Sequence, residues 1–335
     1  MIHPKTQSRI LELDVLRGLA AICVVSFHYT TDYTLNYRPS YPMPFHFPWG
    51  AYGVQLFFMI SGYVIFMTLE KTTNLLDFII SRFSRLFPAY WVAIILTFTT
   101  VSFFHLPGRE STFKDAIINL TMLQDWFGAS RVDNVYWTLT VEISFYVVMG
   151  ILYRLKLLKY IEMLVFCWVG FMYLNVHILI LVMHIYVPVW IKTTGLLRYG
   201  SWFFAGILFY NLKNQGNTWT RYLMLLMCLV VQYTYRQEIN PFGSFFLFVL
   251  FYFFIFGQLK WTVNPLTVFL GSISYPLYLI HQNIGYMTIN YLYKLHLNSW
   301  LIFIIPVFLC IAIASAISFG IEKPAMRFIR QKYGH

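Results

Sequence analysis

The fold of this chain is decided by one apolar run near its start, Leu11-Glu-Leu-Asp-Val-Leu-Arg-Gly-Leu-Ala-Ala-Ile-Cys-Val-Val-Ser-Phe-His28. The run has the length of a membrane span, yet it contains Asp14, Arg17 and His28. Ionisable side chains are costly in hydrocarbon, so they usually face a partner or a water-filled cavity. Arg17 and His28 are close to a whole number of helical turns apart, which places them on one face about 16 Å apart along the axis. The run therefore predicts a helix that presents an acid, a fixed cation and a proton-transfer group along one stripe.

The composition predicts an all-α, polytopic integral membrane protein. Of the 335 residues, 59% are hydrophobic and only 11% are charged, which leaves too little polar surface for a soluble globule. The net charge of +11 does not indicate nucleic-acid binding, because Lys and Arg lie mostly in short segments between apolar runs. That distribution is the pattern that orients membrane proteins. The four cysteines all fall within apolar runs, so we expect them to be packing residues.

Windows of about 20 apolar residues predict ten transmembrane helices. A cytoplasmic N-terminus gives a two-to-one excess of Lys and Arg in the inner segments, so both termini are expected in the cytoplasm. The first run is interrupted by charges and is expected to stay attached as a span rather than to act as a cleaved signal. We expect residues 1–335 to form a single membrane-embedded domain with no appended soluble domain. The predicted spans are 11–33, 50–69, 86–104, 134–153, 161–186, 195–212, 220–235, 241–259, 264–292 and 298–320.

One acidic residue, Glu142, lies deep in a predicted span, within Val135-Tyr-Trp-Thr-Leu-Thr-Val-Glu-Ile-Ser-Phe-Tyr146. Thr138 and Tyr146 flank it at four-residue spacing and give the helix a polar face. Two interpretations stay open for this carboxylate. It either belongs to a structural hydrogen-bond network or pairs with a buried arginine, or it has a place in the reaction site beside a histidine or the acceptor.

Two histidines are candidates for the reaction site. His28 shares its stripe with two charged residues, which favours a general base over an ordinary packing residue. His281 lies in a later span, one turn after Tyr278, and the helix-disturbing Pro276 is expected to open the backbone nearby. For His281, lining of the site and a purely structural role stay equally open.

Arg82 and Arg85 are three residues apart, on one face of a helix where the third predicted span meets the cytoplasm. They are either ordinary cytoplasmic anchors or a clamp for a phosphorylated ligand, because guanidinium groups bind phosphate in a bidentate fork. Ser61 and Gly62 fall near the middle of another span. Small residues there permit close helix packing, and we favour that over a serine nucleophile because no Gly-x-Ser-x-Gly elbow is present.

Six short patterns resemble, in their order along the chain, the acyltransferase-3 family. This family comprises multi-spanning bacterial acyltransferases, many of which are O-acetyltransferases of surface polysaccharides. The resemblance covers nearly the whole chain. The patterns are Leu-Asp-x-Leu-Arg-Gly with a ten-residue gap from Arg17 to His28, Phe-Phe-x-x-Ser-Gly-Tyr, Arg-x-x-Arg-Leu-x-Pro, Tyr-Trp-Thr-Leu-x-Val-Glu-x-x-Phe-Tyr, Ser-Tyr-x-Leu-Tyr-Leu-x-His and a terminal Glu-Lys-Pro.

The resemblance implies acyl-CoA, expected to be acetyl-CoA, as the donor and the cytoplasmic (inner) membrane as the location. It implies that His28 is the catalytic histidine and that Arg17, Arg82, Arg85 and Glu142 have functional roles. Larger members of the family carry an extracytoplasmic esterase-like domain that this chain is expected to lack. Direct transfer to the acceptor and transfer through a separate extracytoplasmic partner therefore both stay open.

Together these features predict an O-acyltransferase that acts on a carbohydrate or lipid-linked glycan at the outer face. Acyl-CoA would dock from the cytoplasm against Arg82 and Arg85, helped by Arg17, and its thioester would reach His28. That histidine would either deprotonate an acceptor hydroxyl or carry the acyl group itself, and Glu142 would hold the imidazole tautomer or position the acceptor. The further candidates for substrate contact are Asp14, Tyr136, Trp137, Tyr278 and His281.

Three further expectations follow from the residue pattern. No metal site is expected, because the histidines lack paired ligand spacing. The aromatic and proline-rich loop at residues 41–49 is either a sugar platform or an interfacial anchor. The rival class is a proton-coupled secondary transporter, and an accessory membrane subunit is a third alternative. The oligomeric state is left open.

Overall fold

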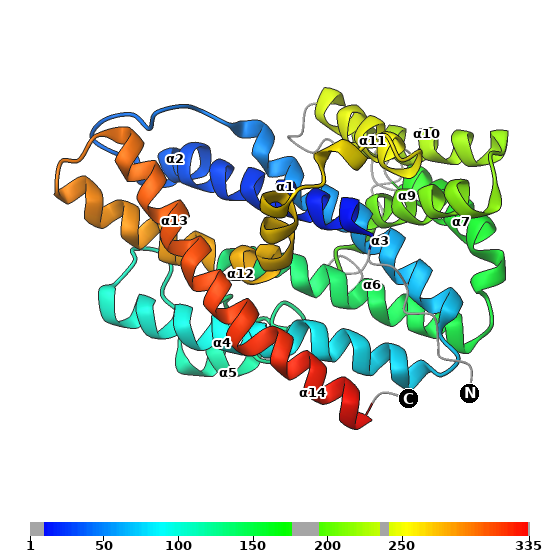
Figure 1. Ribbon diagram of the computed structural model, residues 1–335, viewed down its shortest axis with the longest axis horizontal. Helices are drawn as coiled ribbons and strands as arrows, with labels where there is room; N and C mark the ends of the chain where they lie inside the picture. Colours follow the sequence, from blue (N-terminus) through cyan, green and yellow to red (C-terminus); the bar gives the residue numbers. More distant parts are fainter. Residues whose placement is uncertain (1–9, 176–193, 235–240, 334–335) are drawn as a thin grey trace.

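The computed structural model describes residues 10–175, 194–234 and 241–333, and within these ranges the chain forms helices and no β-strand. The all-α prediction is thereby confirmed (Figure 1). The main helices are α1 (Leu11–Phe27), α2 (Tyr33–Tyr37), α3 (Gly53–Lys71), α4 (Leu75–Phe104), α5 (Phe113–Asn119), α6 (Trp137–Arg154), α7 (Ile161–Leu174), α9 (Leu196–Gln215), α10 (Trp219–Thr234), α11 (Pro241–Ile255), α12 (Pro265–Lys294), α13 (Ser299–Ile317) and α14 (Lys323–Tyr333).

Several helices have the length and apolar composition of membrane spans. Among the described residues, α10 and α11 include apolar stretches that are shorter than a membrane span. Large apolar side chains such as Phe103 and Phe308 are 77% and 66% exposed. Apolar surface of this extent suits lipid better than water. The count of ten spans stays a prediction, and the expected span 161–186 lies partly outside the described residues. Four helical stretches of the described chain are long enough to cross a membrane, namely Pro48–Lys71, Leu75–Phe104, Asn134–Arg154 and Ser299–Tyr333.

The first helix, α1, packs against α12 and α3 in the body of the bundle (Figure 1). At the crossing with α12, a Cβ atom added to Gly18 would lie 2.8 Å from the backbone nitrogen of Gly271. A Cβ atom added to Gly271 would lie 2.1 Å from the carbonyl oxygen of Asp14. Only glycine hydrogens fit between these backbones, as at other close crossings of membrane helices. The crossing therefore fixes the charged stripe of α1 against α12.

A second close crossing joins α3 to α9. A Cβ atom added to Gly62 would lie 2.0 Å from the carbonyl oxygen of Phe203, and one added to Gly206 would lie 2.0 Å from that of Met59. Gly62 therefore has the close-packing role expected from its place in the span.

Two π-helical segments interrupt the regular helices at sites of polar contact. The segment η1 (His28–Asp32) continues α1, and the segment η7 (Ser318–Glu322) continues α13. Such π-bulges occur frequently at functional sites. Here His28 begins the first segment and Glu322 ends the second.

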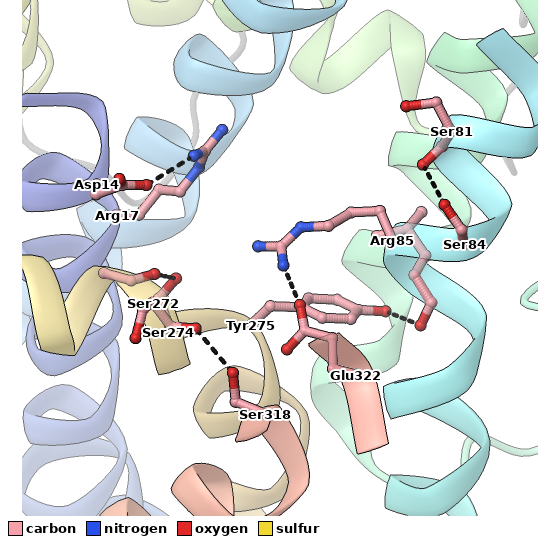
Figure 2. Close-up of polar contacts among 12 residues, drawn as sticks. Asp14, Arg17, Ser81, Ser84, Arg85, Ser272, Ser274, Tyr275, Ser318 and Glu322 are labelled. Atoms are coloured by element: carbon pink, nitrogen blue, oxygen red, sulfur yellow. Dashed lines mark hydrogen bonds and ion pairs between the residues drawn. The ribbon is translucent and has the colours of Figure 1, made fainter. Parts of the chain in front are cut away.

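Pro276 lies inside α12, which continues through it as one helix from Pro265 to Lys294. Because proline lacks an N–H group, the carbonyl oxygen of Ser272 loses its α-helical partner. The hydroxyl of Ser318, on η7, donates to that oxygen at 3.0 Å (Figure 2). The acceptor that Pro276 leaves without a helical donor is thus satisfied by a neighbouring segment, as is common for proline in membrane helices.

Candidate active site

Two imidazole rings meet where α1 ends. The Nδ1 atom of His28 lies 3.1 Å from the Nε2 atom of His281, which is on α12. The ring centroids are 4.9 Å apart and the rings meet edge to face. His281 is fully buried, whereas His28 is partly exposed. The two histidines are 253 residues apart in the sequence, and the α1–α12 crossing brings them together.

The hydrogen-bond partners assign a tautomer to each neutral ring. The Nδ1 atom of His281 lies 2.8 Å from the carbonyl oxygen of Tyr278, so Nδ1 carries the proton and Nε2 is an acceptor. The Nδ1 atom of His28 faces that acceptor and also lies 3.0 Å from the carbonyl oxygen of Val24. Both neighbours accept, so Nδ1 of His28 carries its proton. The lone pair of His28 is therefore on Nε2.

This arrangement prepares His28 to act as a base. If Nε2 takes up a proton, the positive ring keeps its Nδ1–H donated to two acceptors, His281 and the carbonyl of Val24. A hydrogen bond from a charged donor is stronger than one from a neutral donor. These two hydrogen bonds would strengthen if Nε2 took up a proton.

His28 lines a cavity of about 160 Å³, which we call the histidine cavity. It lies between α1, α3, α12 and the start of α6. The described residues that line it are Val24, Phe27, His28, Ala51, Val54, Gln55, Asn134, Val135, Trp137, Tyr199, Tyr278 and Gln282.

A second cavity, of about 110 Å³, contains three arginines and is called the arginine cavity. Arg17 comes from α1, and Arg82 and Arg85 come from α4. Val54 and Tyr278 line both the arginine cavity and the histidine cavity, so the two are neighbours along α3 and α12. The structure thus places the two ends of the α1 stripe in adjoining cavities.

The three arginines are held in different ways. Arg17 pairs with Asp14 at 3.3 Å, and Arg85 forms an ion pair with Glu322, which is fully buried. Figure 2 shows the guanidinium groups of Arg17 and Arg85 directed from α1 and α4 into the space between these helices. Arg82 donates to Ser81 at 3.1 Å, but its buried Nε atom has no hydrogen-bond partner among the described residues. Arg82 thus has one buried N–H group that no described residue satisfies.

Glu142 faces the arginine cavity. Its Oε1 atom accepts hydrogen bonds from Ser61 at 2.8 Å and from Tyr146 at 2.5 Å. The sequence left open whether this carboxylate holds the tautomer of a histidine. In the structure the tautomer of His28 is held by His281, and Glu142 belongs to a hydroxyl network beside the arginines.

The family model described as "Acyltransferase domain" matches residues 10–319. The chain belongs to the acyltransferase-3 family. The resemblance to this family is confirmed.

Relatives of this acyltransferase-3 protein include several named O-acetyltransferases. Peptidoglycan O-acetyltransferase OatA of Listeria monocytogenes is 28% identical over 154 residues, which are 41% of this chain and 23% of that protein. The O-acetyl transferase of Shigella phage Sf6 is 26% identical over 151 residues, 41% of this chain and 44% of that protein. The chain spans about a quarter of the length of the first peptidoglycan relatives that it matches. No solved structure matches it.

Of the other residues expected to contact substrate in this acyltransferase-3 protein, some line the histidine cavity and others are buried outside it. Trp137 and Tyr278 line the histidine cavity, and the hydroxyl of Tyr278 lies 2.9 Å from that of Thr138. Tyr136 is buried against the ring of Tyr90, with centroids 5.0 Å apart. Asp14 is buried beside Arg17.

The loop at residues 41–49 packs partly onto the ends of α12 and α13. Tyr41 contacts the ring of Tyr293, and Phe45 contacts Phe303 at a centroid distance of 4.9 Å. Trp49 is 47% exposed. Both expectations for this loop, as a sugar platform and as an interfacial anchor, stay predictions. In the described part of the chain, no group of three or more potential ligands for a metal ion occurs.

Three polar residues at the site did not stand out in the sequence. Gln55 and Gln282 line the histidine cavity, but uncharged amides within apolar runs gave no signal. Glu322 pairs with Arg85, whereas the sequence showed it only as part of the terminal Glu-Lys-Pro pattern and gave it no partner. A buried acid at the end of an apolar run was the available signal, because such a carboxylate needs a cationic partner.

A buried carboxyl, Asp133, supports the histidine pair from the segment before α6. It accepts hydrogen bonds from the backbone N–H groups of Asn283, at 3.1 Å, and Val135, at 3.3 Å. Burial raises the pKa of Asp133 from its ordinary 3.8 to about 7. This carboxyl ties α12, two residues after His281, to the start of α6.

Proposed function

We propose that this chain transfers an acetyl group from acetyl-CoA in the arginine cavity to a sugar hydroxyl in the histidine cavity. In this reaction Nε2 of His28 takes the proton of the acceptor hydroxyl as the oxygen attacks the thioester carbonyl. The C–S bond then breaks, and the departing thiolate receives the proton from the imidazolium. The observation that carries the proposal is the orientation of His28, whose Nε2 lone pair is fixed by His281 in a cavity adjoining three arginines.

The donor fits the arginine cavity in part. Pockets that enclose drug-sized ligands have volumes of roughly 300–1,000 Å³, and the arginine cavity has about 110 Å³. Only the acyl and thiol end of the donor would enter it, with the phosphates bound by guanidinium groups at its mouth. The three arginines that line the arginine cavity support this assignment.

The direction of transfer follows from the proposed membrane orientation. With ten spans and both termini in the cytoplasm, α1 enters from the cytoplasmic side of the inner membrane, so Arg17 lies nearer the cytoplasm than His28. Acetyl-CoA would then bind from inside, and the acceptor would bind from outside. The names of the relatives, peptidoglycan O-acetyltransferase among them, support a carbohydrate acceptor.

The test is transfer of labelled acetyl from acetyl-CoA to glycans by protein reconstituted in lipid nanodiscs. We expect the wild type to acetylate at least one glycan and His28→Asn to lose about 10²–10⁴-fold of the rate, as for removal of a general base. His296→Ala, at an exposed histidine, serves as the matched control and should retain the rate. Equal rates for His28→Asn and wild type would overturn the general-base role.

A mass-spectrometric search for acetylated protein would separate direct transfer from an acyl-enzyme. Rapid acid quenching of the reaction should give no acetyl group on His28 if the sugar oxygen attacks the thioester directly. An acetylated imidazole that forms and decays at the rate of turnover would show double displacement instead.

A further inference from the structure

A third cavity lies where five helices begin or end, and it shares no described lining residue with the histidine and arginine cavities. It is formed by the C-terminal ends of α3, α6 and α9 and the N-terminal ends of α7 and α10, at one end of the bundle (Figure 1). We call it the α6–α7 cavity. Its volume is about 740 Å³, within the roughly 300–1,000 Å³ of pockets that enclose drug-sized molecules. Two stretches long enough to cross a membrane, Pro48–Lys71 and Asn134–Arg154, end beside it, so with these as spans it lies at the boundary between bilayer and water.

Three cationic side chains line the rim of the α6–α7 cavity. Arg154 ends α6, and Lys156 and Lys159 follow in the short segment before α7. All three are exposed, and none forms an ion pair with another residue of the described chain. Lys159 also lies over the ring of Tyr160, with its Nζ atom 4.7 Å from the ring centroid. Because these residues are accessible as well as cavity-lining, they can contact an anion that enters from the membrane surface.

The acidic side chains of the cavity do not cancel this charge. Glu162 is already paired, since its Oε1 atom accepts from Nε of Arg221 at 2.6 Å and from the amide of Asn211 at 2.9 Å. Glu70 accepts from the amide of Gln215 at 3.4 Å. The described lining contains four Lys and Arg residues against two Glu residues, a net charge of +2. The cavity therefore favours an anionic ligand.

Lys156 occupies a backbone position where glycine is favoured. Its φ is 58°. The N–H of Lys156 donates to the carbonyl oxygen of Tyr153 at 2.9 Å, and that of Leu157 donates to Leu152 at 2.8 Å. This is the Schellman ending of a helix, in which the left-handed residue is usually glycine. A side chain there carries a conformational cost that glycine avoids, so this lysine places a cation on the rim at the expense of stability.

An apolar stripe on α7 leads away from the cavity. Tyr160 and Met163 line the cavity and are exposed, and Phe166, one turn further along α7, is 51% exposed. Residues three apart share one face of a helix. Exposed apolar surface of this kind suits acyl chains better than water. The cavity thus joins a cationic rim to an apolar exit, which matches a molecule with an anionic head and apolar chains rather than a soluble phosphate.

We propose that the α6–α7 cavity binds the headgroup of an anionic phospholipid. The phosphate lies against Arg154, Lys156 and Lys159, and an acyl chain runs along Met163 and Phe166. Basic pockets between transmembrane helices bind anionic headgroups in other membrane proteins. The lipid joins the segment between α6 and α7 to the ends of α3, α9 and α10. The assignment does not depend on the proposed transferase function, and its test involves no acetyl transfer.

Native mass spectrometry of the full chain in a neutral detergent measures lipid binding directly. Delipidated protein is titrated with phosphatidylglycerol, and phosphatidylcholine, whose headgroup has no net charge, is the comparison lipid. We expect phosphatidylglycerol to bind more tightly. Arg154→Gln and Lys159→Gln should each weaken its binding about fivefold, as for loss of one cation near an anionic headgroup. The matched control Lys260→Gln removes the same charge from an exposed lysine outside the described cavity lining and should leave binding unchanged.

The variant Lys156→Gly separates lipid binding from stability. Glycine fits the left-handed conformation at this position, so the lipid-free variant should melt at the wild-type temperature or above it. Its affinity for phosphatidylglycerol should fall about fivefold, and the rise in melting temperature caused by a fixed amount of this lipid should be smaller than in the wild type. A lipid-free melting temperature well below that of the wild type would show that Lys156 supports the fold, and would count against the assignment.

A soluble headgroup tests the source of the anion. Glycerophosphoglycerol is phosphatidylglycerol without its acyl chains, so it lacks the part that the α7 stripe would hold and should not displace the lipid at equal concentration. Displacement at equal concentration would overturn the lipid assignment in favour of a soluble phosphate. Equal binding of phosphatidylglycerol and phosphatidylcholine would also overturn it. So would losses in the cavity variants that are no greater than the loss in Lys260→Gln.

Discussion

Replacing His281 by leucine removes the acceptor that holds the Nδ1–H of His28, and we expect kcat to fall about 10- to 30-fold. A hydrogen bond to a charged group contributes about 1.5–3 kcal/mol. The imidazolium of His28 would keep the carbonyl oxygen of Val24, at 3.0 Å, as a second acceptor. The loss should therefore lie near the lower end of that range, and each 1.36 kcal/mol in the barrier is a tenfold change in rate.

Steady-state kinetics of acetyl transfer in nanodiscs would measure this loss. His281→Gln can present an amide oxygen toward Nδ1 of His28, so it should recover most of kcat. The KM values for donor and acceptor should change less than about twofold in either variant, because His281 lies behind His28 rather than in the cavity lining. The backbone of α12 at residue 281 should keep its conformation in both variants. The hydroxyl of Tyr29 donates to the carbonyl oxygen of residue 281 at 2.9 Å, and this bond does not depend on the side chain there.

A double variant separates positioning from a merely structural role. If His281 acts through His28, adding His281→Leu to His28→Ala should cause no further loss of rate, because residues that act as a unit are not additive. A kcat for His281→Leu within twofold of wild type would refute the reasoning. So would a full multiplicative loss in the double variant.

Three further perturbations test other parts of the site. Arg82→Gln should raise the KM for acetyl-CoA about tenfold, because one guanidinium contact to phosphate is lost. The KM for S-acetyl-N-acetylcysteamine, a thioester without phosphates, should stay unchanged. Equal effects on the two donors would contradict phosphate binding by Arg82. Because its pKa is raised to about 7, Asp133 holds its proton in the folded state at pH values where the unfolded chain has lost it. Its contribution to the free energy of unfolding, on the order of 4 kcal/mol, is therefore fully present below about pH 4 and is lost as the pH rises to about 7. Asp133→Asn should abolish that part of the pH dependence in thermal unfolding, and identical pH profiles would refute it. Gly271→Ala should destabilise the fold by about 1–3 kcal/mol through the clash with the backbone of Asp14. The control Gly170→Ala should not destabilise it, because a Cβ atom there meets open space on α7. Equal melting temperatures of the two variants would argue against the α1–α12 crossing.

The sequence predicted the helices and the contents of the first stripe because these depend on local pattern. Apolar runs give helices in lipid wherever they occur, and the helical period alone put Arg17 and His28 on one face. The structure places those two residues in adjoining cavities. The spacing of Arg82 and Arg85 likewise predicted a shared helix face, and both residues line the arginine cavity.

Contacts between distant segments were beyond such reasoning. The pairing of His28 with His281 depends on where α1 crosses α12, which is set by the backbone approach at Gly18 and Gly271. The helical period does not encode that crossing. For the same reason the partner of Arg85 was missed, because Glu322 reaches it from a segment 237 residues away.

The meeting of α1 and α12 also sets an order of events during synthesis. His281 is translated 253 residues after His28, which takes about 10–50 s at common elongation rates of roughly 5–20 residues per second. With α1 as a membrane span, as predicted, its ionisable groups would stay in the bilayer for that time, and the neighbouring opposite charges of Asp14 and Arg17 would lower the free-energy cost. An unfinished chain therefore holds His28 without the ring that orients it. The imidazole pair can assemble only after α12 has been made, so under the proposed function an incomplete chain would lack the aligned base that could release acetyl groups to water.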